Sequence, residues 1–238
     1  MGFQFDVAFF AYEIGIGIKY IPIVLLLSIV PLIVGLLFGT GIAIVRLFKV
    51  RVLAKVFTVI VVFLRGVPLL LQLTILYLTV TLSFDSLAQT VGLKITSKDI
   101  SYTLVAVVGL SINATVYLSE VVRTALQSVN SGQYEAAYSV GMTSGQMLKR
   151  IVIPQAMPVA IPLIGSNFIG LIKGSSIASL ISVVELINGT LFEANGNYKF
   201  LEAYLASAII YWALCIIVER IVASLEIRVG VYGKGGVV

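Results

Sequence analysis

Four ionisable side chains lie inside long apolar runs of this sequence: Arg65, Glu120, Arg123 and Lys173. If those runs cross a bilayer, each charge costs roughly 2.5–3.5 kcal/mol on insertion scales, so we expect it to face protein or water. Charges of both signs in such a place can bind the ionic groups of a small solute. They can equally hold helices together, with Glu120 paired to Arg123 and Arg65 capping carbonyls or reaching the headgroups.

The spacing of these residues predicts shared helical faces. Asn113, Tyr117 and Glu120 follow one another at four and three residues, which places them on one side of a helix. Arg65 and Gln72 are seven residues apart and share a face in the same way. Lys173 is followed by a run of small residues. The side chains that we expect to line a solute route are Arg65, Gln72, Asn113, Tyr117, Glu120, Lys173 and Ser175.

The sequence has few of the residues that enzymes use for catalysis. The chain has no histidine, and its one cysteine, Cys215, lies in a late apolar run, so no internal disulfide, zinc cluster or histidine-based triad is expected. With no histidine, and with Glu120 and Glu185 as the only acids near the apolar runs, a general acid–base pair is hard to assemble. No G-x-x-x-x-G-K-[ST] phosphate loop occurs. We therefore expect no enzyme activity, no metal site and no cofactor in this chain.

Composition places the chain in a membrane. Of its 238 residues 59% are hydrophobic and 11% charged, and the mean hydropathy is +1.08. A soluble domain of this size cannot bury that much apolar surface. The net charge of +5 does not indicate nucleic-acid binding, because no basic run is interleaved with aromatic residues outside the apolar runs. The sequence predicts an all-α membrane protein.

Five apolar runs are long enough to cross a bilayer, which takes about 20 residues each. We expect spans over residues 20–45, 56–82, 101–126, 159–187 and 203–222. Residues 1–19 are predicted to form an interfacial segment, residues 20–223 the membrane domain, and residues 224–238 a tail.

The basic residues are unevenly divided between the two sides of such a bundle. Five alternating spans place ten of the 16 together, and the side that carries more Lys and Arg is the cytoplasmic one. This rule predicts the N-terminus outside and the C-terminus in the cytosol. The ten are Arg46, Lys49, Arg51, Lys55, Arg123, Lys149, Arg150, Arg220, Arg228 and Lys234.

The longest segment that could not sit in lipid is the cytoplasmic loop within residues 131–162. Ser131 and Gly132 favour a helix start, with Glu135 in the first turn. Gly141 interrupts that helix, Thr143 or Ser144 can cap a second one, and the prolines at 154 and 158 are expected to end it. The pattern predicts two short helices joined by a bend, which can pass an external push to both flanking spans.

This loop resembles a known sequence pattern. Glu135-Ala136-Ala137, three residues, Gly141, nine residues and Ile151-x-Ile153-Pro154 are similar to the EAA loop of ABC-importer permeases, with Ile153 in place of leucine. The residues of this match that the resemblance assigns to ATPase coupling are Glu135, Ala136, Ala137, Gly141, Ile151 and Pro154, within a coupling loop of residues 131–158.

Three further segments are similar to the polar-amino-acid branch of that family. Residues 65–72 resemble R-G-T-P-L-L-x-Q with valine in place of threonine, and residues 117–123 resemble Y-x-x-E-x-x-R. Residues 171–176 resemble L-x-K-D-T-S, with Gly174 where aspartate is usual. The resemblance covers about residues 20–223 and is weak before the first span.

The resemblance implies a fold, a mechanism and partners. The fold is the type I ABC-importer transmembrane fold in a bacterial cytoplasmic membrane. Two permease subunits, identical or homologous, form one pathway, and an extracellular solute-binding protein delivers a polar amino acid such as cystine, glutamine, arginine or histidine. Two separate ATPases bind ATP and magnesium and dock on the EAA loops. In that setting Arg65 or Lys173 would attract an α-carboxylate and Glu120 an amino group.

The main alternative is a secondary transporter or channel that works without ATP through Arg65, Glu120 and Lys173. It offers no reason for the EAA spacing.

Overall fold

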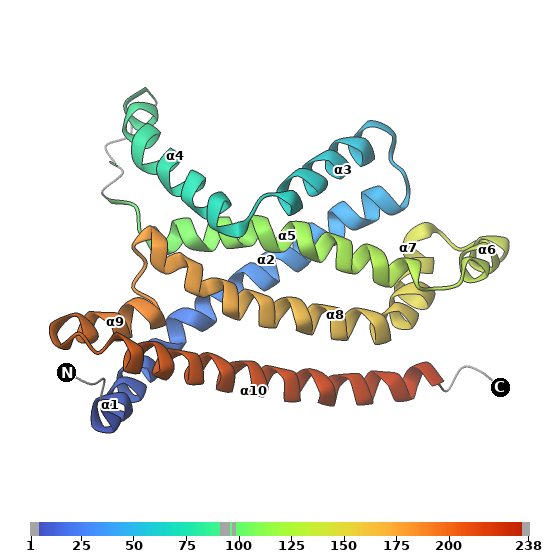
Figure 1. The fold of residues 1–238 in the computed structure, drawn as a ribbon. Coiled ribbons are helices and arrows are strands. Elements are labelled where there is room, and N and C mark those ends of the chain that lie inside the picture. Colours follow the sequence, from blue (N-terminus) through green and yellow to red (C-terminus); the bar gives the residue numbers. More distant parts are fainter. Residues whose placement is uncertain (1–4, 91–95, 97–98, 235–238) are drawn as a thin grey trace.

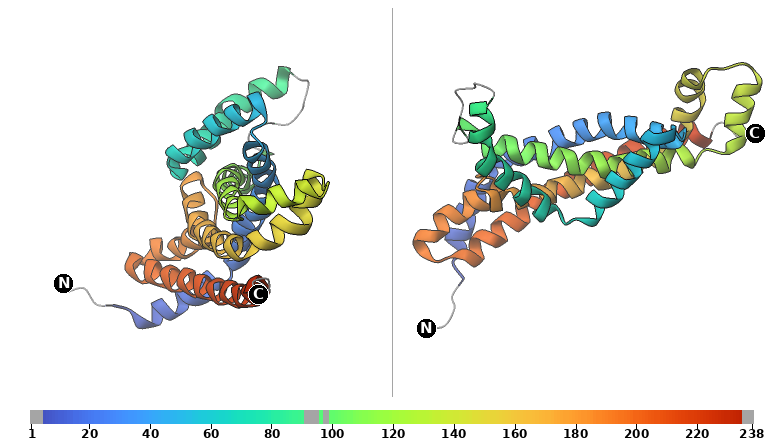
Figure 2. Two further views of the ribbon diagram at one scale, coloured as in Figure 1. Left: turned by 90° about the vertical axis from the view of Figure 1, so that its right-hand side faces the viewer. Right: turned by 90° about the horizontal axis from the view of Figure 1, so that it is seen from above.

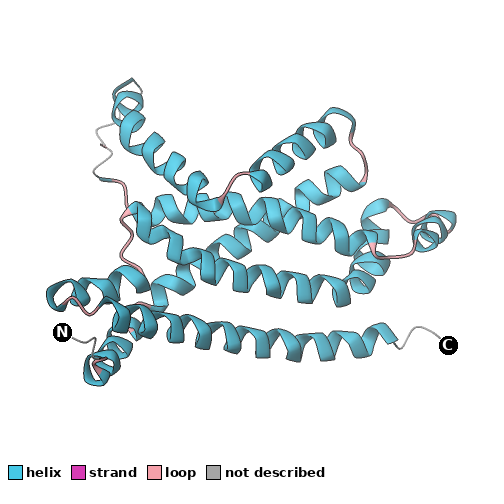
Figure 3. Cartoon of the chain, in the orientation of Figure 1, coloured by secondary structure: helices cyan, strands magenta, loops and turns pink. Residues whose placement is uncertain are grey.

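The computed structural model describes residues 5–90, 96 and 99–234. Within them the chain is helical, with short turns and loops between the helices (Figure 3). The expected all-α fold with five spans is confirmed. Lys94, Lys98 and residues 1–4 and 235–238, the last of which belong to the predicted tail, lie outside the described residues. The five helices long and apolar enough to cross a membrane are Ile21–Leu47, Leu69–Thr90, Tyr102–Gln127, Ser144–Ile181 and Phe200–Gly230.

The centre of the bundle is the pair α2 (Ile21–Leu47) and α5 (Tyr102–Gln127). Gly35 and Gly39 bring the two backbones together: a Cβ on Gly39 would lie 2.9 Å from the backbone nitrogen of Ser119 and 2.9 Å from the carbonyl oxygen of Thr115. Residues without side chains at a helix contact permit this approach. The long helix α10 (Phe200–Lys234) packs along α8 (Ile153–Gly174) at the edge of the bundle (Figure 1).

The second expected span, 56–82, is wrong as a single helix. The chain forms α3 (Arg51–Gly66) and α4 (Leu69–Thr90), which diverge from a sharp break at residues 67–68 (Figure 1). Val67 is extended, with φ −95° and ψ 127°, because the ring of Pro68 disfavours the helical conformation in the residue before it. Only α4 is long and apolar enough to be a span.

The loop within residues 131–162 forms α6 (Ser131–Ser139) and α7 (Ser144–Met147), with Gly141 between them at φ +78°. Thr143 caps α7 through a reciprocal capping box with Gln146. Glu135, the fifth residue of α6, lies beyond the first turn.

The expected end of the second helix at Pro154 and Pro158 is wrong, because α7 continues through the π turn η2 (Leu148–Val152) into α8. Pro154 stands at the start of α8, where its missing N–H is tolerated, and the wider turn precedes it.

The remaining elements close the opposite end of the bundle. The 3₁₀ helix η3 (Ser175–Ile181) extends α8 and leads into α9 (Leu186–Asn197). The short helix α1 (Val7–Ile18) precedes the first span and packs against α9 and α10. The view from above places α1 and α9 at one end and α6 and α7 at the other (Figure 2, right), in agreement with Figure 1.

Candidate functional site

A charged cluster surrounds Glu120 where three helices meet. Arg46, in the last turn of α2, places Nη1 2.6 Å from Glu120 Oε1. Arg123, one turn further along α5, donates to Glu120 Oε2 from Nε at 3.1 Å and from Nη2 at 2.9 Å. Both carboxylate oxygens therefore already accept hydrogen bonds from arginine.

Arg65 is held more loosely at the edge of this cluster. Its Nη1 lies 3.9 Å from Glu120 Oε1, and its side chain is 47% exposed. The guanidinium carbon lies 5.7 Å from the ring centre of Tyr117, within the range of a cation–π contact. Arg65 is thus the guanidinium of the cluster with the greatest freedom to contact a ligand.

Gln72 and Asn113 join the α3–α4 break to α5. The Gln72 amide donates to the carbonyl oxygens of Leu64 at 2.7 Å and Val67 at 2.8 Å, which the helix end would otherwise leave without donors. Asn113 Nδ2 donates to Gln72 Oε1 at 3.2 Å. This chain of amides fixes the start of α4 against the middle of α5.

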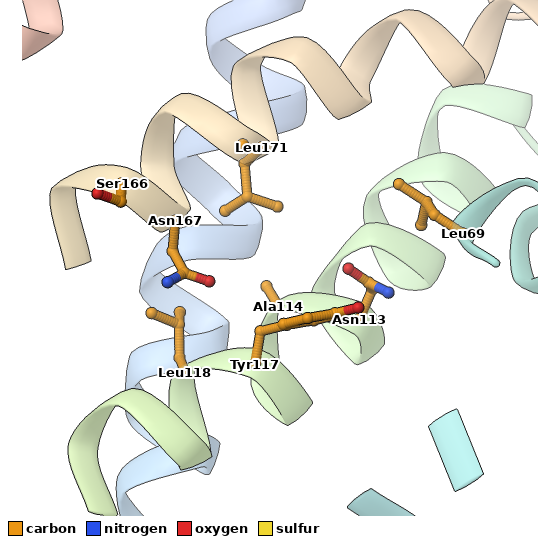
Figure 4. A pocket seen from close by; sticks show the side chains of 9 residues that line it. Leu69, Asn113, Ala114, Tyr117, Leu118, Ser166, Asn167 and Leu171 are labelled. Carbon is orange, nitrogen blue, oxygen red and sulfur yellow. The ribbon is translucent and has the colours of Figure 1, made fainter. Parts of the chain in front are cut away.

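A cavity of about 340 Å³ opens between α5, α8 and the start of α4 (Figure 4). Asn113 and Tyr117 reach it from α5, and Asn167 reaches it from α8. The full lining is Leu69, Asn113, Ala114, Tyr117, Leu118, Ser166, Asn167, Gly170 and Leu171. No charged side chain belongs to it, so its polarity comes from amides, a hydroxyl and a phenol.

Lys173 and Ser175 do not line this cavity. Lys173 lines a second pocket of about 530 Å³ between α8 and α10, together with Trp212 and Glu219. Ser175 is fully buried and donates to the Ile172 carbonyl oxygen at 2.7 Å. The expected set of seven is therefore divided. Asn113 and Tyr117 line the cavity, and Lys173 and Ser175 do not. Gln72 contacts Asn113, Arg65 contacts the Tyr117 ring, and Glu120 lies next to Arg65.

Several polar residues of the interior were not among the expected site residues. Arg46 was assigned only to the basic side of the membrane, and nothing in the sequence links it to a residue 74 positions away. Asn167 lines the cavity, and its position as a polar amide within an apolar run could have indicated this from the sequence. Glu185, fully buried, accepts a hydrogen bond from the Tyr211 hydroxyl at 2.7 Å and from the N–H of Ile187 at 2.9 Å, and so caps α9.

The α6–α7 corner, defined as residues 131–147, presents the EAA residues at one end of the bundle. Glu135, Ala136 and Gly141 are exposed, whereas Ala137 is 1% exposed and packs beneath them. Ile151 is half-buried and Pro154 exposed, on the π turn and at the start of α8.

One apolar cluster fixes this corner to the spans. Ala137 from α6, Met147 from α7 and Ala156 from α8 pack against Ala125 and Leu126 at the end of α5. The Tyr134 hydroxyl also donates to the Leu126 carbonyl oxygen at 2.8 Å, and burial raises the pKa of Tyr134. The corner is therefore exposed on its outer face and firmly joined to α5 and α8, two of the helices that line the cavity.

Comparison with known proteins gives a consistent result. Residues 32–231 match the family described as "Binding-protein-dependent transport system inner membrane component". The chain is 38% identical over 200 residues to the probable amino-acid permease protein YxeN of Bacillus subtilis, with 84% of this chain and 85% of that protein covered. It is 36% identical to the L-cystine transport system permease protein TcyB of the same organism, with 87% and 83% covered.

Among solved structures, the chain superposes on the crystal structure of an amino acid ABC transporter with histidines at a TM-score of 0.79 and 26% identity, covering 95% of this chain and 100% of that one. The family match covers most of the sequence, and the fold agrees with it over nearly the whole length. The chain belongs to the family of binding-protein-dependent transport system inner membrane components, within its amino-acid ABC permeases.

Proposed function

We propose that this chain is the permease subunit through which an ABC importer passes a small polar amino acid across a bacterial cytoplasmic membrane. An extracellular solute-binding protein delivers the amino acid. Two cytoplasmic ATPases, which bind ATP and magnesium, dock on the α6–α7 corner. A second permease subunit, identical or homologous, completes the pathway.

The observation that carries this proposal is the connection between the α6–α7 corner and the cavity. Glu135 and Gly141 are exposed for an ATPase to contact, while Ala137 and Met147 are buried against α5 and α8. A push on the corner therefore moves the helices that line the cavity. The basic residues on the same side favour a cytosolic location for it.

An exposed stripe on α8, which carries one hydroxyl and one ammonium group, supports a second permease subunit. Ser166, Gly170 and Lys173 follow one another at four and three residues, share one face, and are all exposed in the single chain. A lysine at bilayer depth has to face protein or water. A partner subunit that covers this stripe would enclose a pathway between the two chains.

For the substrate, the cavity offers amide and phenol groups, with Arg65 just outside it. Arg65 is placed to attract an α-carboxylate, and Lys173 could do so in the second pocket. Glu120 is less suited to bind an amino group, because Arg46 and Arg123 already occupy both of its oxygens. The relatives named as amino-acid and L-cystine permeases favour a polar amino acid as the substrate.

The test is reconstitution of the full importer in proteoliposomes with its ATPase and binding protein. We expect Glu135→Arg to abolish binding-protein-stimulated ATP hydrolysis and uptake while the permease itself stays folded. Glu226→Arg, a charge reversal at an exposed position of α10, is the matched control and should leave both activities intact. Normal coupling in Glu135→Arg, or uptake by the chain without ATPase, would contradict the proposal.

A further inference from the structure

Glu13 is a buried acid without a partner, at the end of the bundle away from the α6–α7 corner. Its side chain is 0% exposed, on the face of α1 that packs against α10 and α9. Neither Oε1 nor Oε2 has a hydrogen-bond partner within the described part of the chain. Buried polar groups are nearly always hydrogen-bonded, so this exception calls for a physical explanation.

The other buried acids nearby show the usual arrangement. Glu185 accepts hydrogen bonds from Tyr211 and from two backbone N–H groups. Glu202, 2% exposed, accepts one from the backbone N–H of Asp6 at 2.9 Å. An ionised carboxylate that is buried without such donors costs several kcal/mol, whereas a neutral carboxylic acid costs much less. Glu13 therefore favours its protonated form.

The charged groups around α1 do not neutralise Glu13. From α9, the charge of Glu193 opposes its ionisation. On the α10 side, Glu202 is engaged with the Asp6 backbone, and Lys199 forms an ion pair with the Asp6 carboxylate at 2.5 Å. At the start of α1, the carboxylate of Asp6 is the group that pairs with Lys199. Burial first, and Glu193 second, raise the pKa of Glu13 to about 7.

On this face α1 packs closely against α10. Gly17 lies one turn after Glu13 on the same face. A Cβ on Gly17 would collide with the side chain of Ile210 on α10, so the two helices are in close contact there. Once ionised, Glu13 can be hydrated only if α1 moves away from α9 and α10.

We propose that Glu13 is a proton-binding site that controls the docking of α1 on α9 and α10. The protonated acid permits docking, and its ionisation drives α1 outward. The proposal is independent of what the chain transports.

The direction of the pH dependence follows from linkage. The pKa of Glu13 is about 7 in the docked state, above the ordinary value of 4.5. Docking is therefore strongest below pH 4.5 and weakens as the pH rises towards 7, by up to about tenfold in the docking constant per pH unit. Above pH 7 the loss is complete and the docking constant no longer changes.

Spin labels on the full-length chain in lipid nanodiscs test this. In a Cys215→Ser background, cysteines replace Ala11 and Ile209, both exposed, on α1 and α10. We expect one short inter-label distance at pH 5 and a longer population that grows up to about pH 7 and is then constant to pH 8. Glu13→Gln should keep the short distance throughout. Glu193→Gln, the matched control, should retain the transition at lower pH, because one repelling charge is gone.

A distance that does not change with pH in the parent chain, or an unaltered transition in Glu13→Gln, would overturn the proposal. Infrared spectroscopy on the parent chain gives a second measurement that does not depend on whether the variants fold. A protonated-carboxyl band should disappear over the same pH range as the short distance. A parent chain without such a band below pH 7 would also exclude the proton site.

Discussion

Arg46 Nη1 lies 2.6 Å from Glu120 Oε1 and so ties the end of α2 to α5. The two side chains are 9% and 15% exposed. Removing one member of such a pair leaves the other charged and poorly hydrated, which costs about 3–5 kcal/mol for fully buried pairs. The partial exposure here favours the lower end of that range.

We accordingly expect Glu120→Gln to lower the thermal stability of the purified permease as well as uptake. Arg123→Gln is the control, because its 31% exposed side chain pairs within one helix and such pairs contribute only about 0.3–0.5 kcal/mol. Thermal unfolding of both variants measures the difference. Equal stability losses would show that the Arg46 contact is not the dominant one.

Gly39→Ala should destabilise the α2–α5 contact. The added Cβ would meet backbone atoms of Thr115 and Ser119, which cannot rotate away. Overpacking of this kind costs about 1–3 kcal/mol. Gly41→Ala, two residues on, meets no atom within 4 Å and should be neutral or slightly stabilising. Unfolding midpoints in detergent compare the two, and a Gly39→Ala chain as stable as Gly41→Ala would refute the close contact.

Gly141→Ala should impair the α6–α7 corner through backbone conformation alone. A Cβ at this position meets nothing within 4 Å, but φ is +78°, where an L-residue is strained by about 1–2 kcal/mol. We expect lower binding-protein-stimulated ATP hydrolysis by the reconstituted importer. Gly145→Ala, equally open but helical, should leave hydrolysis unchanged. Identical hydrolysis rates in the two variants would mean that the bend at residue 141 tolerates a residue with a side chain.

Asn113→Leu should reduce uptake without dismantling the permease. The substitution removes an amide from the cavity and one hydrogen bond to Gln72, worth about 1 kcal/mol. Ile112→Val, which lies outside the cavity, is the control. Initial uptake rates over a range of substrate concentrations distinguish the two variants. A stable and fully active Asn113→Leu chain would show that the solute does not pass through this cavity.

Hydropathy was sufficient to predict that there are five spans, because each crossing needs about 20 apolar residues. It could not predict the break at Val67 and Pro68, since the sequence is apolar on both sides and proline is tolerated in many membrane helices. At the prolines at 154 and 158 the error was the reverse, because we expected a helix end that does not occur. The chain places a π turn before them and continues as a helix.

The sequence predicted those features of the candidate site that depend on the spacing of residues along a single helix. Asn113 and Tyr117 do share a face and do reach one cavity. Contacts between helices were out of reach, because Arg46 and Glu120 meet only through the packing of α2 on α5. The separation of Lys173 from the cavity likewise depends on how α8 lies between α5 and α10, which the spacing of residues along one helix does not determine.

The continuity of α7, η2 and α8 has a mechanical consequence. From Met147 to Ser166 the backbone remains helical, a length of roughly 30 Å at 1.5 Å per residue. In the proposed cycle this segment acts as a stiff strut that carries force from the ATPase to the cavity wall without an intervening joint. The start of α4, which also lines the cavity, is fixed separately by the hydrogen bonds of Gln72 across the break at Val67, so force that travels along α8 would move α8 relative to α4.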